Sequence, residues 1–344
     1  MPPDESWLLI VGLNGPGNQV HALKQAMFLS RRLQRTLVLP VILPHHSTGD
    51  AVPAYPAEDV YDIDQSYCTH VPSSVARVLP PPSCIFMSQE HAKDAEDQNL
   101  WHRYHRDTLI AASEAQGISE LATLPVRPLS TDVEAFATAT HGMRVVCLCI
   151  FKLVALPAPD KALICRSIGF SHEAVRSAAE AFVSKQFGTR PFVALNLRRV
   201  LDLSTEEPTA LSFRDVFRFD PSELERHLRR LCARAGRRPM RVFLAAPPMY
   251  HGVHGMERIA AACVPEPVSD EPAVNAVVVQ CICCMAHTFV YVDAESTFTQ
   301  FILDYRQHRG AAGSSKCVLT PAPPQAIGRY RWLQDSKYRR LRRA

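Results

Sequence analysis

The sequence predicts an α/β protein with two doubly wound domains, each built on a parallel sheet covered by helices. Three observations favour this class: the length of 344 residues, a strand–turn–helix–strand succession at the start, and a second alternation of strands and helices after residue 190. Chains longer than about 250–300 residues tend to split into separate cores. We expect an N-terminal domain over residues 1–188, a C-terminal domain over residues 189–328, and a basic tail over residues 329–344.

The N-terminal domain opens with a strand, a glycine turn and an amphipathic helix. The apolar run Trp7–Leu13 predicts the strand, and apolar residues then recur at helical spacing from Ala22 to Leu33. A second buried strand is predicted over Thr36–Leu43, closed by Pro44. These segments form a βαβ unit, so the two strands should be parallel.

The rest of the first half is less regular. Residues 44–130 are rich in Pro, Ser, His and Asp, and we expect loops and short helices there. Order returns with a strand over Val145–Ile150, a helix near His172–Lys185 and a strand over Phe192–Leu197. The domain boundary is expected within residues 186–191.

The second half alternates more clearly. Asp220 is predicted to cap a helix over Ser222–Ala235, with Pro221 at its first position. The carboxyl ends of parallel strands are where ligands bind in this class, so we expect a cleft there. The remaining predicted elements are a strand Arg241–Ala246, a helix His254–Ala262, a helix or buried segment Asn275–Ala286, a strand Thr288–Val292 and a helix Glu295–His308.

Composition and charge narrow the function classes. The sequence is 47 % hydrophobic, and no run approaches the roughly 20 apolar residues of a membrane helix, so we expect a soluble chain without a membrane span. The N-terminus lacks the basic start of a signal peptide. From Arg329 onward the tail carries about +6 of charge, which leaves about −2 for the rest of the net +4. We expect a solvated end and no nucleic acid; binding to RNA or to an anionic membrane is the alternative.

No metal site is predicted. The chain has eleven cysteines, and those at Cys147, Cys149 and Cys281 stand in apolar runs, where cysteine behaves as a small core residue. His251 and His254 are close in sequence, but no third ligand follows them in an obvious pattern.

The glycine turn after the first strand is a candidate anion site. Gly12, Gly15 and Gly17 miss the spacing of a dinucleotide fingerprint. The turn nevertheless places backbone N–H groups at a helix start, with Asn18 and Gln19 as further donors. A purely structural turn is the alternative interpretation.

Four segments together resemble the GDP-fucose protein O-fucosyltransferases. Gly17-Asn18-Gln19, followed by Arg35-Thr36-Leu37 before Pro40, is similar to the opening segment of that family. The later matches are Val193–Asp202, similar to a strand ending in His-Leu-Arg with Asp four residues on; Val242–Ala246, similar to the strand before an Ala-Thr-Asp turn; and Phe289–Thr299 with Arg306, similar to a Gly-Asn-x-x-Ser-Ser-Phe segment and its downstream arginine.

The resemblance implies a GT-B fold, with two Rossmann-like domains facing a central cleft. It implies inverting transfer of fucose from GDP-fucose, or a related nucleotide sugar, to a Ser/Thr hydroxyl of a protein or to another glycan acceptor, without a metal or other cofactor. It also implies the endoplasmic reticulum or Golgi lumen, although the sequence shows no signal peptide or anchor. Arg198 and Asn18 are the implied catalytic residues. The implied nucleotide-sugar set is Gly15, Gly17, Asn18, Gln19, Asn196, Arg198, Asp202, Ala246, Ser296, Thr297 and Phe298.

Some of these positions have a physical rationale of their own. Arg198 offers a permanent charge to the leaving β-phosphate, whose negative charge grows as the glycosidic bond breaks; an ion pair with Asp202 is the alternative. Ser296 and Thr297 open a helix and so form a second anion site, or serve as a simple N-cap. Phe298 either flanks the guanine or fills the core.

The sequence departs from the family pattern at three places. Asn196 stands for the histidine, Pro247 for the aspartate of Ala-Thr-Asp, and Val292-Asp293 for Gly-Asn. A second hypothesis follows from these departures: a catalytically degenerate member that binds a nucleotide, glycan or protein without transferring sugar.

Overall fold

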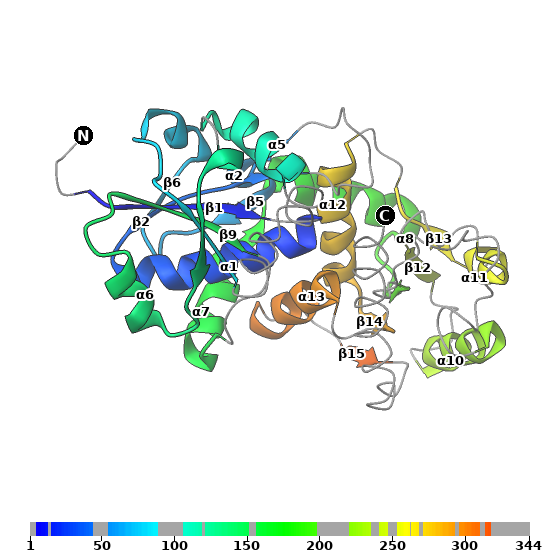
Figure 1. Ribbon diagram of the computed structural model, residues 1–344. Coiled ribbons are helices and arrows are strands. Elements are labelled where there is room, and N and C mark those ends of the chain that lie inside the picture. The colour runs from blue at the N-terminus through cyan, green and yellow to red at the C-terminus, as the bar shows by residue number, and fades with distance from the viewer. Residues whose placement is uncertain are drawn as a thin grey trace, which may run out of the picture. The chain divides into compact units, whose positions relative to one another are not determined.

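The chain forms two compact units, and it passes between them several times. Unit 1 comprises Met1–Arg190, Glu266–Ala286 and Gln300–Ala312; unit 2 comprises Pro191–Pro265, His287–Thr299 and Gly313–Ala344. The computed structural model (Figure 1) describes residues 5–12, 15–43, 54–88, 106–118, 121–150, 156–197, 220–234, 241–246, 253–261, 263–267, 271–292, 296–309 and 314–317.

Unit 1 contains a six-stranded sheet in the order β6-β2-β1-β9-β7-β8, in which every pairing is parallel. The predicted first strand forms the middle of this sheet, and it pairs along its whole length with β9. The strands are β1 (Trp7–Gly12), β2 (Thr36–Val38), β6 (His70–Val71), β7 (Ile85–Ser88), β8 (Val126–Leu129) and β9 (Val145–Ile150).

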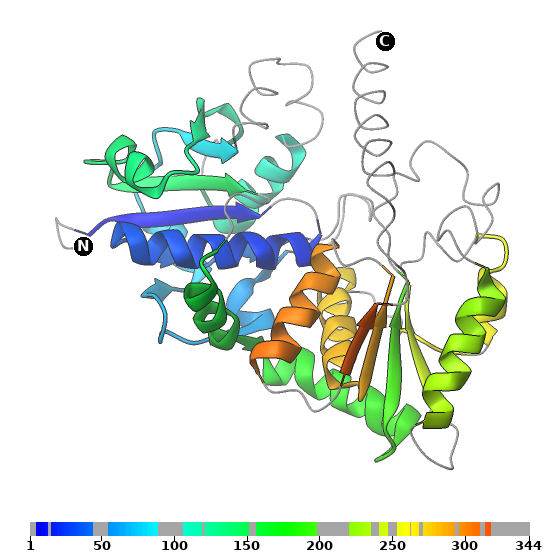
Figure 2. The same ribbon diagram turned by 90° about the horizontal axis from the view of Figure 1, so that it is seen from below.

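The two faces of β1 are buried in different ways. Trp7, Leu9 and Val11 alternate along the strand and join a core cluster with Leu109 and Ala112 of α5 (Arg106–Gln116). Helix α1 (Pro16–Leu33) runs alongside β1 in Figure 2. A strand that is covered on both faces has a continuous apolar sequence, and this is why β1 could be predicted from the sequence.

Unit 1 contains further strands and helices beside this sheet. Two small antiparallel sheets pair β3 with β4 and β5 with β10. Their strands are β3 (Val41–Ile42), β4 (Tyr55–Pro56), β5 (Tyr61–Ile63) and β10 (Ile168–Phe170). The helices, besides α1 and α5, are α2 (Ala57–Val60), the 3₁₀ turns η2 (Ser73–Val78) and η3 (Leu121–Thr123), α6 (Val133–Ala139), α7 (Ala158–Ser167), the π-helical turn η4 (His172–Arg176), α8 (Ser177–Phe187) and α12 (Pro272–Met285).

Two predictions for unit 1 were wrong in part. The segment Thr36–Leu43 is not one strand: it divides at Pro40 into β2 and β3, which belong to different sheets. Proline has no N–H to donate to a ladder, so it interrupts pairing there. Residues 44–130 were expected to hold loops and short helices, yet β6, β7 and β8 complete the main sheet from this region. Strands of two to four residues are too short to show a periodicity.

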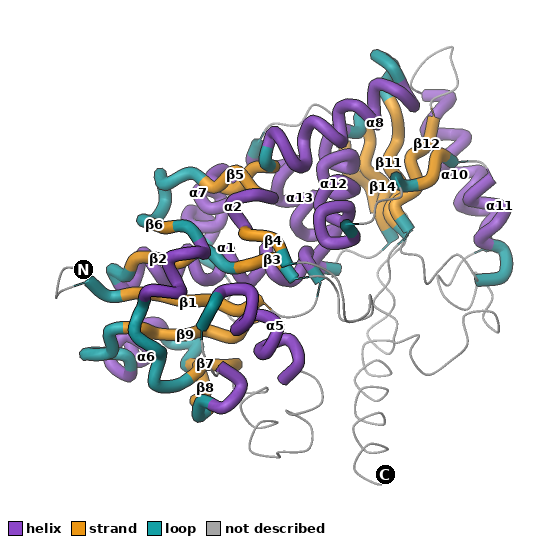
Figure 3. The backbone as a smooth tube through the Cα atoms, turned by 90° about the horizontal axis from the view of Figure 1, so that it is seen from above, coloured by secondary structure: helices purple, strands orange, loops and turns teal. Residues whose placement is uncertain are grey.

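Unit 2 contains a five-stranded parallel sheet in the order β13-β12-β11-β14-β15. Apolar residues of β11, β12 and β14 form one core cluster with α10 (Pro221–Arg234) and α11 (Met256–Ala261). Figure 3 shows these two helices beside the strands. The strands are β11 (Phe192–Asn196), β12 (Arg241–Ala245), β13 (Val264–Pro265), β14 (Thr288–Tyr291) and β15 (Ser314–Cys317).

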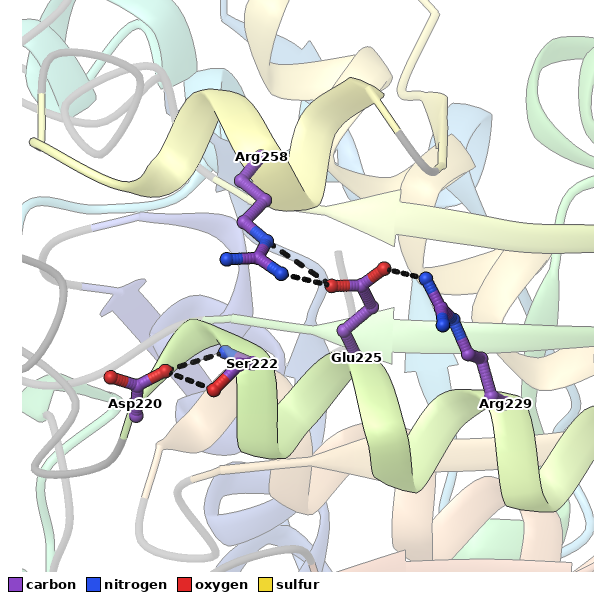
Figure 4. Close-up of polar contacts among 5 residues, drawn as sticks. All are labelled: Asp220, Ser222, Glu225, Arg229 and Arg258. Carbon is purple, nitrogen blue, oxygen red and sulfur yellow. Dashed lines mark hydrogen bonds and ion pairs between the residues drawn. The ribbon is translucent and has the colours of Figure 1, made fainter.

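The helices on this face are fixed by polar contacts at their surface (Figure 4). Asp220 accepts a hydrogen bond from the backbone N–H of Ser222 at 2.8 Å, which caps α10 as the sequence predicted. Glu225 lies between two arginines, accepting from Arg229 of its own helix and from Arg258 of α11 at 3.0 Å. These contacts tie α10 to α11 above the buried leucines.

Helix α13 (Thr297–His308) begins in unit 2 and continues into unit 1, and α12 belongs wholly to unit 1. The expected C-terminal domain, residues 189–328, contained both helices. The difference arises because α12 packs on α1 and α8, and because α13 forms its polar and aromatic contacts beyond Thr299 with unit 1. None of the described helices is long and apolar enough to span a membrane.

Candidate functional site

The glycine turn of unit 1 leads into α1. Gly15 is the N-cap residue, in an extended conformation, and Pro16 stands at the first helical position. The N–H of Asn18 donates to the Gly15 carbonyl at 2.8 Å, so the helix begins directly after the turn. Gly15 and Gly17 are buried and Asn18 is half-buried. The turn therefore presents the start of an 18-residue helix, the local geometry that favours an anion.

Gln19 has a structural role beside this turn. Its side-chain amide donates to the carbonyl of Leu43 at 2.7 Å and accepts from the N–H of Leu43 at 2.8 Å. These two bonds tie α1 to the chain that follows β3. The Gln19 side chain also lies against Gly12: a Cβ at residue 12 would stand 2.8 Å from the Gln19 Cβ. Gly12 is thus required for close packing of strand and helix.

In unit 2 the candidate residues gather at the carboxyl edge of the sheet. β11 is parallel to β12 on one side and to β14 on the other, so the three strands end at the same edge. Asn196 is the last residue of β11 and pairs in register with Ala245 and Tyr291. Ala246, the residue after β12, is buried at this edge. Ligands of doubly wound folds bind at such an edge.

The start of α13 comes to the same place. The side-chain amide of Asn196 donates to the hydroxyl of Thr299 at 2.9 Å, and both side chains are buried, with 1 % and 0 % exposed. A hydrogen bond between two buried groups fixes both of them, because breaking it would leave each without water as a partner. Thr299 carried no predicted role, although the sequence shows it as a third hydroxyl residue, after Ser296 and Thr297 and about one helical turn from Ser296.

The segment Ser296–Phe298, which leads into α13, lies at the same edge of the sheet. Ser296 precedes the first residue of α13 and is 3 % exposed, Thr297 is half-buried, and Phe298 is 6 % exposed. The structure thus brings Asn196 and the first turn of α13 together. Arg198 and Asp202 lie outside the described residues, as do Pro247, Asp293, His251 and the tail over residues 329–344.

Arg306, matched to the family's downstream arginine, serves a different purpose from ligand binding. Its Nη1 donates to the carbonyl oxygens of Cys284 at 2.9 Å and of Ala286 at 2.6 Å, with a longer contact to Cys283 at 3.3 Å. The side chain therefore caps the C-terminus of α12. Burial lowers the pKa of Arg306, and the carbonyl oxygens are its partners in the core.

The cysteines of the apolar runs lie in the core. Burial raises the pKa of Cys147 and of Cys281 to about 12 each, so these thiols stay protonated at neutral pH. Within the described residues, no group of three His, Cys, Asp or Glu side chains is arranged to hold a metal ion. His254 is exposed.

The fold matches solved fucosyltransferase structures. POFUT1 in complex with GDP-fucose superposes with a TM-score of 0.63 at 15 % identity, covering 92 % of this chain and 99 % of that one. The fucosyltransferase NodZ from Bradyrhizobium gives a TM-score of 0.52 at 13 % identity, covering 90 % and 94 %. NodZ alpha-1,6-fucosyltransferase soaked with GDP-fucose gives 0.51 at 15 %, covering 88 % and 93 %. No family model and no curated protein matches the sequence.

The comparisons define the class of fold. The chain has the GT-B fold of these fucosyltransferases, which confirms the fold class that the resemblance implied. The resemblance to the fucosyltransferases is confirmed as one of fold along nine-tenths of the chain, well beyond the four matched segments.

Proposed function

We propose that the chain is a glycosyltransferase that uses GDP-fucose and transfers fucose with inversion to a Ser/Thr hydroxyl of a protein or to another glycan acceptor. The observation that carries this proposal is the convergence of Asn196 with the first turn of α13 at the carboxyl edge of the unit 2 sheet. The fold around it is shared with POFUT1 in complex with GDP-fucose over 92 % of the chain.

The diphosphate is assigned to the start of α13. Ser296 supplies a hydroxyl there, and the helix N-terminus supplies N–H groups and the positive end of the helix dipole. Arg198 follows Asn196, the last residue of β11, by two residues in the sequence. Its guanidinium is assigned to the phosphate oxygens, as a charged fork that binds two of them together. Phe298 and Ala246 are assigned to the nucleoside.

The proposed reaction depends on stabilising the negative charge of the leaving GDP and needs no covalent intermediate with the protein. The acceptor oxygen bonds to the anomeric carbon of fucose while the bond from that carbon to the β-phosphate oxygen breaks, and the hydroxyl proton is released to water. GDP leaves with one more negative charge than it carried in the donor. Arg198 interacts more strongly with that charge as it develops, and this difference lowers the barrier. Asn18, at the glycine turn, is assigned to the sugar or the acceptor, and no metal takes part.

The test is calorimetric titration with GDP, GDP-fucose and UDP-glucose in EDTA, together with turnover of GDP-fucose. Arg198→Ala should reduce kcat/KM by about 100-fold or more, as loss of a charge-stabilising donor does, and should weaken GDP binding. Arg199→Ala, the adjacent arginine, is the matched control and should stay within a few-fold of wild type. An undiminished rate in Arg198→Ala, or a loss of turnover in EDTA, would contradict the proposal.

A second candidate is a degenerate member that binds a nucleotide, glycan or protein without transferring sugar. The Asn196 amide, in the position of the family's histidine, is bonded to Thr299 and is buried. An amide cannot take up a proton as histidine can. In this case GDP or another ligand should bind while the donor remains intact over hours; measurable turnover would exclude it.

A further inference from the structure

The Asn196 side chain is buried at the carboxyl edge of the unit 2 sheet, yet the chain uses only part of its hydrogen-bonding capacity. Its Nδ2 donates to the Oγ1 of Thr299 at 2.9 Å, and both residues belong to unit 2. Asn196 is 1 % exposed and Thr299 is 0 % exposed. Within the part of the chain that the structure describes, no donor reaches the Oδ1 of Asn196. A buried amide therefore keeps one unused acceptor atom.

The place of this acceptor suits a ligand. Buried polar groups in native proteins normally have a hydrogen-bond partner, and an unused one calls for water or a bound molecule. Asn196 ends β11, and its neighbours in register are Ala245 of β12 and Tyr291 of β14. The carboxyl ends of three parallel strands meet there, which is where doubly wound folds bind their ligands.

Thr299 determines which part of the amide is left over. An amide group is planar, with its oxygen and nitrogen on opposite arms, so a bond that fixes the nitrogen also fixes the position of the oxygen. Thr299 stands in the first turn of α13, and its hydroxyl is as deeply buried as the amide. Without this hydroxyl the amide could rotate by half a turn and exchange its two arms.

The chemistry of an amide oxygen limits what it can bind. A carbonyl oxygen accepts hydrogen bonds and donates none. The oxygens of an ionised diphosphate also only accept, so they would be repelled by the Asn196 Oδ1. A guanine nucleoside, by contrast, carries donors on both of its parts: the ribose hydroxyls, and the N–H groups of the base. The Asn196 Oδ1 therefore fits the nucleoside end of a nucleotide.

We propose that Thr299 is a positioning residue that holds the Asn196 amide so that its Oδ1 accepts a hydrogen bond from the nucleoside. The bond comes from a ribose hydroxyl or from an N–H of the base, and Thr299 itself does not contact the ligand. This inference rests on the proposed function, in which a guanine nucleotide binds at this edge. It adds that Asn196 selects the nucleoside, while the diphosphate is held by other groups.

The first experiment measures the affinity of Thr299→Val for GDP and for inorganic pyrophosphate. Valine has the shape of threonine without the hydroxyl. GDP affinity should fall about fivefold to tenfold, the effect of losing one neutral hydrogen bond, whereas pyrophosphate affinity should stay within twofold of wild type. Thr299→Ser, which keeps the hydroxyl, should restore most of the GDP affinity. The matched control is Thr138→Val, which removes an exposed hydroxyl from α6 of unit 1 and should leave both affinities unchanged.

The comparison of the two ligands distinguishes positioning from general damage. If Thr299→Val displaced the whole first turn of α13, pyrophosphate binding would weaken together with GDP binding. A third ligand, 2′,3′-dideoxy-GDP, then identifies the donor. If the difference between wild type and Thr299→Val disappears with this ligand, the oxygen accepts from a ribose hydroxyl; if the difference persists, the oxygen accepts from the base.

The second experiment needs no ligand. In protein labelled with ¹⁵N at asparagine, the side-chain amide signal of Asn196 is identified by its absence in Asn196→Ser. The amide hydrogens of this side chain should exchange with solvent several-fold faster in Thr299→Val than in wild type, because their buried acceptor is gone. Equal exchange in the two proteins would show that Thr299 does not hold the amide.

The outcomes separate this inference from the proposed function. GDP affinity within twofold of wild type in Thr299→Val, or equal losses of GDP and pyrophosphate affinity, would overturn the inference. Wild-type protein that does not bind GDP would instead overturn the proposed function, and the exchange experiment would still decide whether Thr299 holds Asn196. If Thr299→Val does not fold, the wild-type amide signal of Asn196 should shift with GDP and stay in place with pyrophosphate; the reverse would contradict the assignment.

Discussion

Replacing Arg306 by methionine should destabilise unit 1 strongly. Methionine keeps much of the volume of the arginine stem but removes the donor that serves the carbonyl oxygens at the end of α12. The two shorter contacts, at 2.9 Å and 2.6 Å, are hydrogen bonds from a charged donor, and such bonds are worth about 1.5–3 kcal/mol each. Methionine itself is well suited to a buried position, which offsets part of the loss. We expect a net cost of about 3 kcal/mol in the free energy of unfolding.

Urea unfolding followed by far-ultraviolet circular dichroism measures this cost. The matched control is Arg258→Met, because Arg258 is 59 % exposed and is paired with Glu225 at the surface; its loss should cost less than about 0.5 kcal/mol. Hydrogen exchange should rise first in the last turn of α12 in Arg306→Met. A cost below about 1 kcal/mol, or equal effects of the two substitutions, would refute the capping role of Arg306.

Two further predictions concern α10 and α13. Asp220→Ala should lower stability by about 1 kcal/mol through loss of the cap on α10, whereas Asp220→Asn, which keeps an acceptor oxygen, should stay near wild type; equal losses would rule out capping. For Asp304, burial opposes ionisation, but Lys24 and Lys161 outweigh it, so the pKa of this carboxyl is lowered. The contribution of ionised Asp304 to the free energy of unfolding is therefore fully present at pH values above the ordinary aspartate pKa of about 3.9. It is lost as the pH falls through the lower pKa that Asp304 has in the folded protein. The stability difference between wild type and Asp304→Asn should narrow below about pH 3.9, and a difference that widens on acidification would contradict this sign.

The sequence predicted those parts of the fold whose pattern is long. Strand β1 could be predicted because each of its residues is buried and the strand is therefore apolar throughout. Helix α1 could be predicted because apolar residues repeat at helical spacing over about five turns. The two-residue strands β3 and β6 have no period to detect. The membership of α12 in unit 1 depends on packing between segments about 100 residues or more apart, which a local pattern does not contain.

The bonds of the candidate site residues could not be predicted from the sequence. Asn196 was named from the resemblance, as the residue in the place of the family's histidine, and the structure adds its buried partner Thr299. Gln19 was grouped with the ligand-binding residues, yet the structure bonds its amide twice to Leu43. An amide at a helix start has the same sequence signature whether it faces a ligand or a backbone segment. The assignments of Arg198, Asp202 and Asn18 stay predictions.

The order in which the chain visits its two units has a consequence for synthesis. Unit 1 is not complete until residues 300–312 have emerged, although its sheet is finished by Ile150. A nascent chain that has been made only as far as residue 265 must therefore hold α1 and α8 without the cover of α12, whose sequence is largely apolar. Exposed apolar surface of this kind promotes aggregation before folding ends. A fragment cut at residue 190 should therefore be difficult to produce.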